Sequence, residues 1–201
     1  MTHHTLLCLG DSSTIGKGLP LHESFPYQLL QLLRADGHSF YAPEIIAQNG
    51  WTTFELKDHL THTLLLDKYD FVTLLIGVNN QYRNLSAKDY QNDFEFLLNK
   101  AVRLANLPAN VVVISIPDWG ITPFAEGRDA TVIANEINDF NYVNKEITDR
   151  NEVHYVNITP GTREAANDLS LLASDKLHPS AKAYKKWAEL VKEKIDEQIK
   201  N

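Results

Sequence analysis

Three residues near the two ends of the 201-residue chain could together perform nucleophilic chemistry. Ser12 lies in Gly10-Asp11-Ser12, and Asp175 and His178 lie three residues apart, shortly before the C-terminus. A serine hydroxyl is a weak nucleophile until a neighbouring base takes its proton, and histidine is the usual base. A carboxylate that holds the imidazole fixes its tautomer. Read alone, Asp175 could equally cap a turn, with His178 an ordinary loop residue.

Donors for a developing oxyanion are the second requirement of acyl transfer. Gly50 offers a backbone N–H with no side chain in the way, Asn79 offers a side-chain amide, and the N–H of Ser12 is a third candidate. Each such donor can lower the barrier by roughly 3 kcal/mol. Taken singly, Asn49-Gly50 also fits a tight turn and Asn79-Asn80 an ordinary loop.

Alternating strand-like and helix-like segments must position these residues. Buried strands are expected at residues 5–9, 45–47, 71–76, 111–116 and 153–158. Helices are expected after Ser24, after Ser86, around residues 133–140, and from Pro179 at the first turn of the last helix. Strands with continuous apolar runs that alternate with helices predict a parallel sheet covered on both faces.

The candidate residues follow the ends of these strands. Gly10-Asp11-Ser12, Asn49-Gly50 and Gly77-Val78-Asn79 each come directly after an expected strand. In parallel sheets, ligands bind beyond the carboxyl ends of the strands. The three stretches should therefore converge on one edge of the sheet.

A phosphate cradle is the competing interpretation of the first loop, which contains Gly10, Gly16 and Gly18. The P-loop pattern fails because Asp11 stands where a glycine is required and Gly18 replaces the Ser or Thr that should follow Lys17. The dinucleotide pattern G-x-G-x-x-G fails at Ser12. A flavodoxin-like module that binds a phosphate or nucleotide remains the alternative function.

The ordered set of stretches resembles the SGNH (GDSL-type) hydrolase family over nearly the whole chain. Its four blocks correspond to Gly10-Asp11-Ser12, Asn49-Gly50, Gly77-Val78-Asn79-Asn80 and Asp175-x-x-His178-Pro179. The resemblance implies that Ser12 is the nucleophile, His178 the base, Asp175 its partner, and Gly50 and Asn79 the oxyanion donors. Two positions depart from the family pattern, since Ser13 replaces a leucine and Asn80 replaces an aspartate.

The resemblance also implies a fold and a chemistry. We expect a single domain over residues 1–201, a flavodoxin-like three-layer α/β/α sandwich around a parallel sheet of about five strands. The implied activity is hydrolysis of small acyl esters without a metal or organic cofactor. The second alternative is that the chain is an inactive relative, which keeps the family fold but binds carbohydrate instead of hydrolysing esters. Apolar residues near the loops could wall an acyl pocket or serve only loop packing: Trp51, Trp119, Ile121, Pro123 and Phe124.

Composition limits the partners and the compartment. The chain is 43% hydrophobic and 22% charged, which suits a globular core. Its formal net charge of -7 repels phosphate backbones, so nucleic acid is not an expected partner. One cysteine permits no internal disulfide, and neither a secretory signal nor an apolar run of about 20 residues is evident. A soluble, cytoplasmic protein acting on a small-molecule ester is expected.

Overall fold

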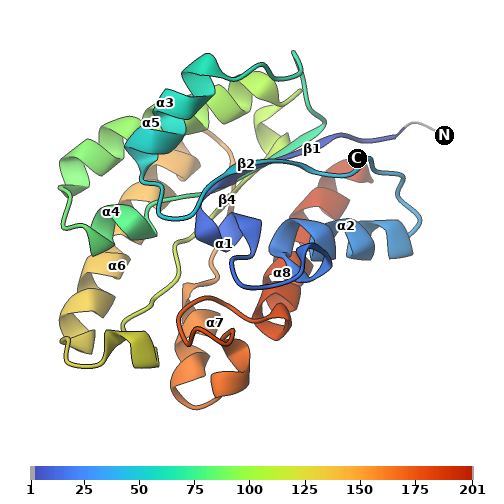
Figure 1. Ribbon diagram of the computed structural model, residues 1–201. Helices are drawn as coiled ribbons and strands as arrows, with labels where there is room; N and C mark the ends of the chain where they lie inside the picture. Colours follow the sequence, from blue (N-terminus) through green and yellow to red (C-terminus); the bar gives the residue numbers. More distant parts are fainter. Residues whose placement is uncertain (1–2, 201) are drawn as a thin grey trace.

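A five-stranded parallel sheet forms the centre of the computed structural model, which describes residues 3–200 (Figure 1). Its strands are β1 (Leu6–Gly10), β2 (Glu44–Ala47), β3 (Phe71–Leu75), β4 (Val111–Ile114) and β5 (His154–Val156). The spatial order is β2-β1-β3-β4-β5, with every neighbouring pair parallel. This is the flavodoxin-like order, in which the winding direction reverses between β1 and β3. The predicted fold class is confirmed.

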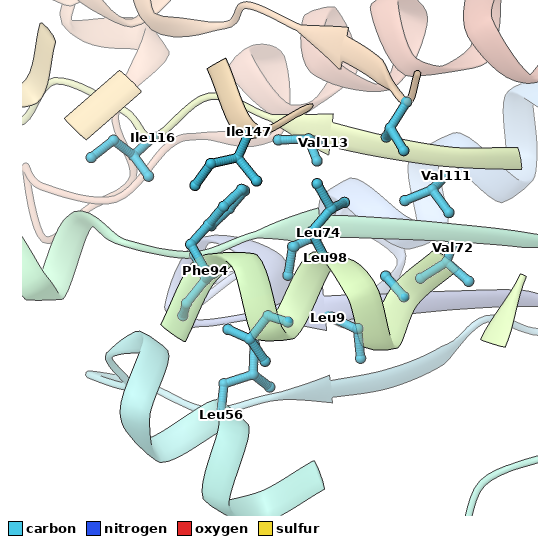
Figure 2. Packing of buried hydrophobic residues seen from close by; sticks show 14 of the residues in the cluster. Leu9, Leu56, Val72, Leu74, Phe94, Leu98, Val111, Val113, Ile116 and Ile147 are labelled. Atoms are coloured by element: carbon cyan, nitrogen blue, oxygen red, sulfur yellow. The ribbon is translucent and has the colours of Figure 1, made fainter. Parts of the chain in front are cut away.

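Three long helices cover one face of the sheet: α3 (Thr53–His62), α5 (Ala87–Leu104) and α6 (Ala130–Arg150). Figure 2 shows how strand residues such as Leu9, Leu74 and Val113 meet Leu56 of α3 and Phe94 of α5. Alternate residues of each strand point to opposite faces of a sheet. One set of apolar positions therefore packs against these three helices.

The other face is covered by α2 (Phe25–Ala35) and α8 (Ala181–Ile199), which also pack against each other. The alternate strand positions, including Leu6, Cys8 and Ile114, are buried beneath them. Both layers of the expected sandwich are thus present, and neither face of the sheet is left to solvent.

Three short helices extend from the carboxyl ends of strands: α1 (Ser12–Ile15) after β1, α4 (Val78–Tyr82) after β3, and α7 (Thr159–Arg163) after β5. The remaining single-turn 3₁₀ helices are Leu21–Glu23, Pro108–Asn110, Pro123–Ala125, Glu164–Ala166 and Leu169–Leu171. Among residues 3–200, no helix combines the length and the apolar character needed to cross a bilayer.

Several predicted boundaries were wrong by one or two residues. The fourth strand ends at Ile114 rather than residue 116, because the N–H of Ile116 donates to the side chain of Asn141 instead of continuing the ladder. Pro179 lies outside the last helix, whose N-cap is Ser180. Ser24 does precede α2, but its hydroxyl donates back to the carbonyl of Leu21 and caps no helical N–H.

Helix α3 was missed by the apolar periodicity, although a local signal for it exists. Thr52 and Glu55 form a reciprocal capping box at its start. The Thr-x-x-Glu spacing is typical of a helix N-terminus. By contrast, the predicted cap at Ser86 is confirmed, since its side chain accepts the N–H of Asp89.

Candidate active site

Ser12 is the first residue of α1, immediately beyond β1. The preceding turn is tight, because a Cβ on Gly10 would lie 2.1 Å from the Thr14 hydroxyl and 2.5 Å from the Leu75 carbonyl. Asp11 is the N-cap of α1, and its Oδ1 accepts the N–H of Ser13 at 2.9 Å. A donor that a phosphate would need is therefore already used, which disfavours the phosphate-binding alternative. The tight turn fixes the Ser12 side chain at the carboxyl edge of the sheet.

The loop before α8 brings Asp175 and His178 to this edge. Oδ1 of Asp175 accepts the backbone N–H groups of Leu177 at 3.0 Å and His178 at 2.9 Å. Its Oδ2 lies 2.6 Å from Nδ1 of His178. Nε2 of the same imidazole lies 3.1 Å from Oγ of Ser12. Carboxylate, imidazole and hydroxyl thus form a continuous chain of hydrogen-bonding groups.

The two carboxylates near Ser12 differ in their ionisation. Partial burial pushes the pKa of Asp175 upward, but the hydrogen bonds from His178 and Leu177 outweigh it, so this pKa lies below its usual value. Complete burial raises the pKa of Asp11 to about 7 despite its hydrogen bond from Ser13. Asp175 is accordingly the carboxylate held in its charged form beside the imidazole, whereas Asp11 shapes the turn.

Gly50 and Asn79 lie on either side of Ser12, because β1 is flanked in the sheet by β2 and β3. The amide nitrogen of Asn79 donates to the Trp51 carbonyl at 2.9 Å and lies 3.4 Å from Oδ2 of Asp11. The carbonyl of Gly50 accepts a hydrogen bond from the guanidinium of Arg83 at 2.5 Å. Together with Ser12 and His178, Gly50 and Asn79 line one cavity.

The two departures from the family pattern have distinct structural settings. Asn80 is buried, where its oxygen accepts the N–H of Thr53 at 3.0 Å and its nitrogen donates to the Thr53 hydroxyl at 2.7 Å. An ionised aspartate could not make the second bond, so Asn80 suits the joint between α4 and α3. Ser13 is buried next to Ser12 in the chain, but the hydroxyl that His178 contacts is that of Ser12.

The cavity has a volume of about 410 Å³ and is bounded by the segments after β1, β2, β3 and β4, by α7, and by the loop that carries His178. Of the five apolar residues proposed from sequence for its wall, Trp119 and Phe124 line it. Trp51 instead packs on His59, with ring centroids 4.8 Å apart, and Ile121 packs beside Ala165 and Leu171. Pro123 begins a 3₁₀ turn and lies outside the lining.

Several lining residues escaped the sequence analysis, namely Lys17, Tyr82, Arg83 and Leu177. Tyr82 and Arg83 follow Asn79 on α4 and its C-cap, so a helical turn after the third block was the available signal. The seven histidines other than His178 all lie outside the cavity lining. Among residues 3–200, no three His, Cys, Asp or Glu side chains are grouped in a way that could hold a metal ion.

Comparison with known proteins gives a family match and a set of similar folds. The model of the GDSL-like lipase/acylhydrolase family matches residues 8–186. Among solved structures, the lipase/acylhydrolase from Enterococcus faecalis has 19% identity and a TM-score of 0.77, covering 97% of this chain and 96% of that one. The comparison with curated proteins gives no match.

Two further solved structures have a similar fold. The psychrotrophic esterase EstA from Pseudoalteromonas sp. has 20% identity and a TM-score of 0.73, covering 98% of this chain and all of that one. The acetylxylan esterase Axe2 from Geobacillus stearothermophilus has 19% identity and a TM-score of 0.76, covering 96% of this chain and 94% of that one. At these identities the likeness establishes the shared architecture.

Proposed function

Since the chain belongs to the GDSL-like lipase/acylhydrolase family, we propose that it hydrolyses small acyl esters through an acyl-enzyme intermediate on Ser12. The observation that carries the proposal is the contact chain from Asp175 through His178 to Ser12, with spacings of 2.6 and 3.1 Å. These distances lie within hydrogen-bond reach, as a nucleophile and its base require. We include in the proposal that residues 1–201 form one hydrolase domain.

In the first half of the reaction, Nε2 of His178 takes the Ser12 proton as the hydroxyl oxygen attacks the ester carbonyl. The carbonyl π electrons move onto oxygen and give a tetrahedral oxyanion. Asp175 holds the proton on Nδ1 and stabilises the imidazolium. His178 then gives its proton to the leaving alcohol as the carbon–oxygen bond breaks, which leaves an acyl ester on Ser12.

The oxyanion is stabilised by donors from residues that line the cavity. We assign this role to the backbone N–H groups of Ser12 and Gly50 and to the side-chain amide of Asn79. That amide donates to the Trp51 carbonyl in the present structure, so it must turn toward the substrate when the oxyanion forms. Catalytic hydrogen bonds often tighten only in the transition-state complex.

Water completes the second half-reaction by the same groups. His178 removes a proton from water, the hydroxide oxygen attacks the acyl carbon, and the proton on His178 returns to Ser12 as the acid is released. A cavity of about 410 Å³ lies within the range of small-molecule sites and is large enough for a small acyl ester. Two proteins of similar fold, an esterase and an acetylxylan esterase, support the same reaction class.

Hydrolysis of p-nitrophenyl acetate by purified Ser12→Ala tests this assignment, with Ser13→Ala as the matched control. We expect the first variant to lose turnover by a factor of about 10³ or more, while the second retains most of it. A fluorophosphonate should label the wild-type protein at Ser12 and leave Ser12→Ala unlabelled. Unchanged turnover in Ser12→Ala, or a wild-type protein that neither turns over esters nor reacts with the label, would contradict the proposal.

A further inference from the structure

Three aromatic side chains form one wall of the cavity that contains Ser12. Tyr82, Trp119 and Phe124 all line it, and their ring centroids lie 5.2 to 6.2 Å apart. The indole N–H of Trp119 donates to the side-chain oxygen of Gln81 at 2.7 Å, and the amide of Gln81 in turn donates to Glu136 at 2.7 Å. These bonds fix the orientation of the largest ring, so the wall is rigid.

Arg128 lies on this aromatic wall. Its guanidinium carbon is 5.1 Å from the Tyr82 ring centroid and 5.0 Å from that of Trp119. Both distances suit a cation–π contact. The backbone around it is also held, because Arg128 donates its N–H to the Ala125 carbonyl at 2.9 Å and Asp129 caps α6. These contacts place an exposed guanidinium over two rings of the wall.

The guanidinium of Arg128 is exposed and makes no hydrogen bond to another residue within 3–200. The chain contains six arginines, all within residues 3–200, and five of them bind a carbonyl, an amide or a carboxylate through their guanidinium groups: Arg34, Arg83, Arg103, Arg150 and Arg163. Among these six, only Arg128 has no hydrogen bond or ion pair from its guanidinium to another described residue. An arginine presents five N–H donors in a planar fork that matches an oxyanion.

Positive charge gathers at this cavity although the protein is acidic overall, with a formal net charge of -7. Lys17 and Arg83 line the cavity, and Arg128, which is not itself a lining residue, contacts the lining residues Tyr82 and Trp119. Among the described lining residues the only carboxylate besides these cations is Asp118, whose Oδ2 is bound by Arg163 at 2.8 Å. Arg83 is itself paired with Glu55 at 2.9 Å, so the attraction for an anion comes mainly from Arg128 and Lys17.

We propose that the ester substrate carries a carboxylate or phosphate group, which Arg128 binds at the aromatic wall while the ester carbonyl lies at Ser12. This inference rests on the ester hydrolysis proposed above and names the chemical class of its substrate. Arg128 acts as a binding residue, because it holds a part of the substrate that does not react. A planar guanidinium and an oxyanion form two parallel hydrogen bonds, which adds direction to the charge attraction.

Matched pairs of esters test the proposal, each pair differing only in the charged group. Mono-p-nitrophenyl glutarate against p-nitrophenyl butyrate places a carboxylate on the acyl side. 4-Acetoxyphenylacetate against 4-acetoxytoluene places it on the alcohol side, and 4-acetoxyphenyl phosphate against 4-acetoxyanisole replaces it by phosphate. In wild-type enzyme we expect kcat/KM to favour the charged member of at least one pair by about tenfold or more. The favoured pair shows whether the anion is a carboxylate on the acyl side, a carboxylate on the alcohol side, or a phosphate.

The variant Arg128→Gln should lower kcat/KM for that charged ester by about tenfold, mostly through KM, and change the neutral partner by less than about twofold. Arg128→Lys keeps the charge but not the planar guanidinium, so its kcat/KM for the charged ester should lie between those of wild type and Arg128→Gln. Arg103→Gln is the control, because it removes the same charge from a residue that binds the Asn99 carbonyl on α5, whereas Arg128 lies over the rings of the aromatic wall. Circular dichroism confirms that each variant is folded.

Two results would overturn the inference while leaving the proposed function intact. One is a wild-type enzyme that hydrolyses the neutral ester at least as well as the charged ester in all three pairs. The other is an Arg128→Gln variant in which kcat/KM falls equally for both members of a pair. A wild-type protein that hydrolyses none of the six esters and takes up no fluorophosphonate would instead contradict the proposed function itself.

Discussion

At the scale of single residues, Asp175 uses its two carboxylate oxygens for different purposes. Oδ1 accepts two backbone N–H groups that shape the loop, and Oδ2 meets the imidazole of His178. Replacement by asparagine can keep the first function through its amide oxygen. It places an NH₂ group against Nδ1, however, and so favours the imidazole tautomer whose Nε2 carries the proton and cannot act as a base.

We therefore expect Asp175→Asn to stay folded but to lose kcat for p-nitrophenyl acetate by a factor of about 10² to 10⁴. Asp168→Asn is the matched control, because Asp168 is an exposed carboxylate paired with Lys182 outside the cavity lining. It should keep nearly full activity. If folded Asp175→Asn keeps the kcat of the wild-type protein, the Asp175 carboxylate has no role in the mechanism.

Asp11 should make the stability of the fold depend on pH. Burial raises its pKa to about 7, whereas an unfolded aspartate titrates near ~3.9. A carboxyl whose pKa is raised in the folded state contributes stability that is complete below the unfolded pKa and is lost as pH rises through the folded one. Between about pH 4 and pH 7 the loss is at most roughly 4 kcal/mol.

Asp11→Asn removes this titration and keeps the cap, because asparagine caps helices about as well as aspartate. Urea unfolding at pH 5 and pH 8 provides the measurement. Between pH 5 and pH 8, we expect the free energy of unfolding to fall by about 2 kcal/mol more in the wild-type protein than in Asp11→Asn. All other titrating groups are common to both proteins, so parallel pH profiles would show that Asp11 has an ordinary pKa.

The residues of the proposed triad could be named from sequence because the ordered set of stretches resembles a known family, although Asp175 and His178 read alone also fit an ordinary turn. Asp175 and His178 are three residues apart in one loop, and Ser12 follows the end of an apolar strand. Arg128 and Tyr82 gave no such signal, since they come from different segments and meet only in the folded chain. Contacts of this kind depend on tertiary packing, which single-sequence patterns do not encode.

At the scale of elements, Gly77 controls how α4 leaves β3. Its φ of 135° belongs to a backbone region that side chains rarely adopt, and an added Cβ would lie 2.6 Å from the ring of Tyr90. Tyr90 is fully buried in the core between α5 and α6, so it cannot move away. Backbone strain and overpacking therefore act together at this position.

Gly18 provides the matched comparison, because it also has a positive φ, of 85°, but nothing lies within 4 Å of an added Cβ. We expect Gly18→Ala to lower the free energy of unfolding by about 1 kcal/mol, from backbone strain alone. Gly77→Ala should lower it by about 3 kcal/mol or more. Urea denaturation of both variants tests this, and equal losses would mean that the contact with Tyr90 is relieved without cost.

The three inner strands β1, β3 and β4 were predicted most clearly, since burial on both faces gives each a nearly unbroken apolar run. The edge strands β2 and β5 are less buried and include Glu44 and His154. Helix α3 was missed because its apolar residues are few, with only Leu56 and Leu60 as buried leucines. Its start is instead marked by the capping box of Thr52. The prediction that Pro179 lies in the first turn of the last helix was wrong, because proline is also compatible with the position before the N-cap, where it lies.

At the scale of the whole molecule, strand order decides which loops meet. The edge strands β2 and β5 carry a weaker apolar signal than the three inner strands, but this difference does not specify that β1 lies between β2 and β3. That order places the segments carrying Gly50 and Asn79 on either side of Ser12, whereas His178 arrives from the loop before α8. The sequence therefore predicted that the candidate stretches share one edge of the sheet. Which of them flank Ser12 could be determined only from the strand order.

Charge at this scale leads to a final prediction, which depends on the anionic substrate inferred above. The acidic molecule repels an anion at long range, while Arg128, Lys17 and Arg83 attract it at the cavity. At 0.1 M salt the screening length is about 10 Å, and at 1 M it is about 3 Å. Long-range repulsion is already weak at 0.1 M, so additional salt acts mainly on the local attraction.

We therefore expect KM for the charged ester to rise by about threefold between 0.1 and 1 M sodium chloride, while KM for its neutral partner changes by less than about twofold. In Arg128→Gln the salt dependence for the charged ester should become shallower, because one of the attracting cations is absent. If KM for the charged ester instead falls with salt in wild-type enzyme, repulsion by the acidic surface dominates at the cavity. The three cations would then be too weakly coupled to the bound substrate to select it by charge.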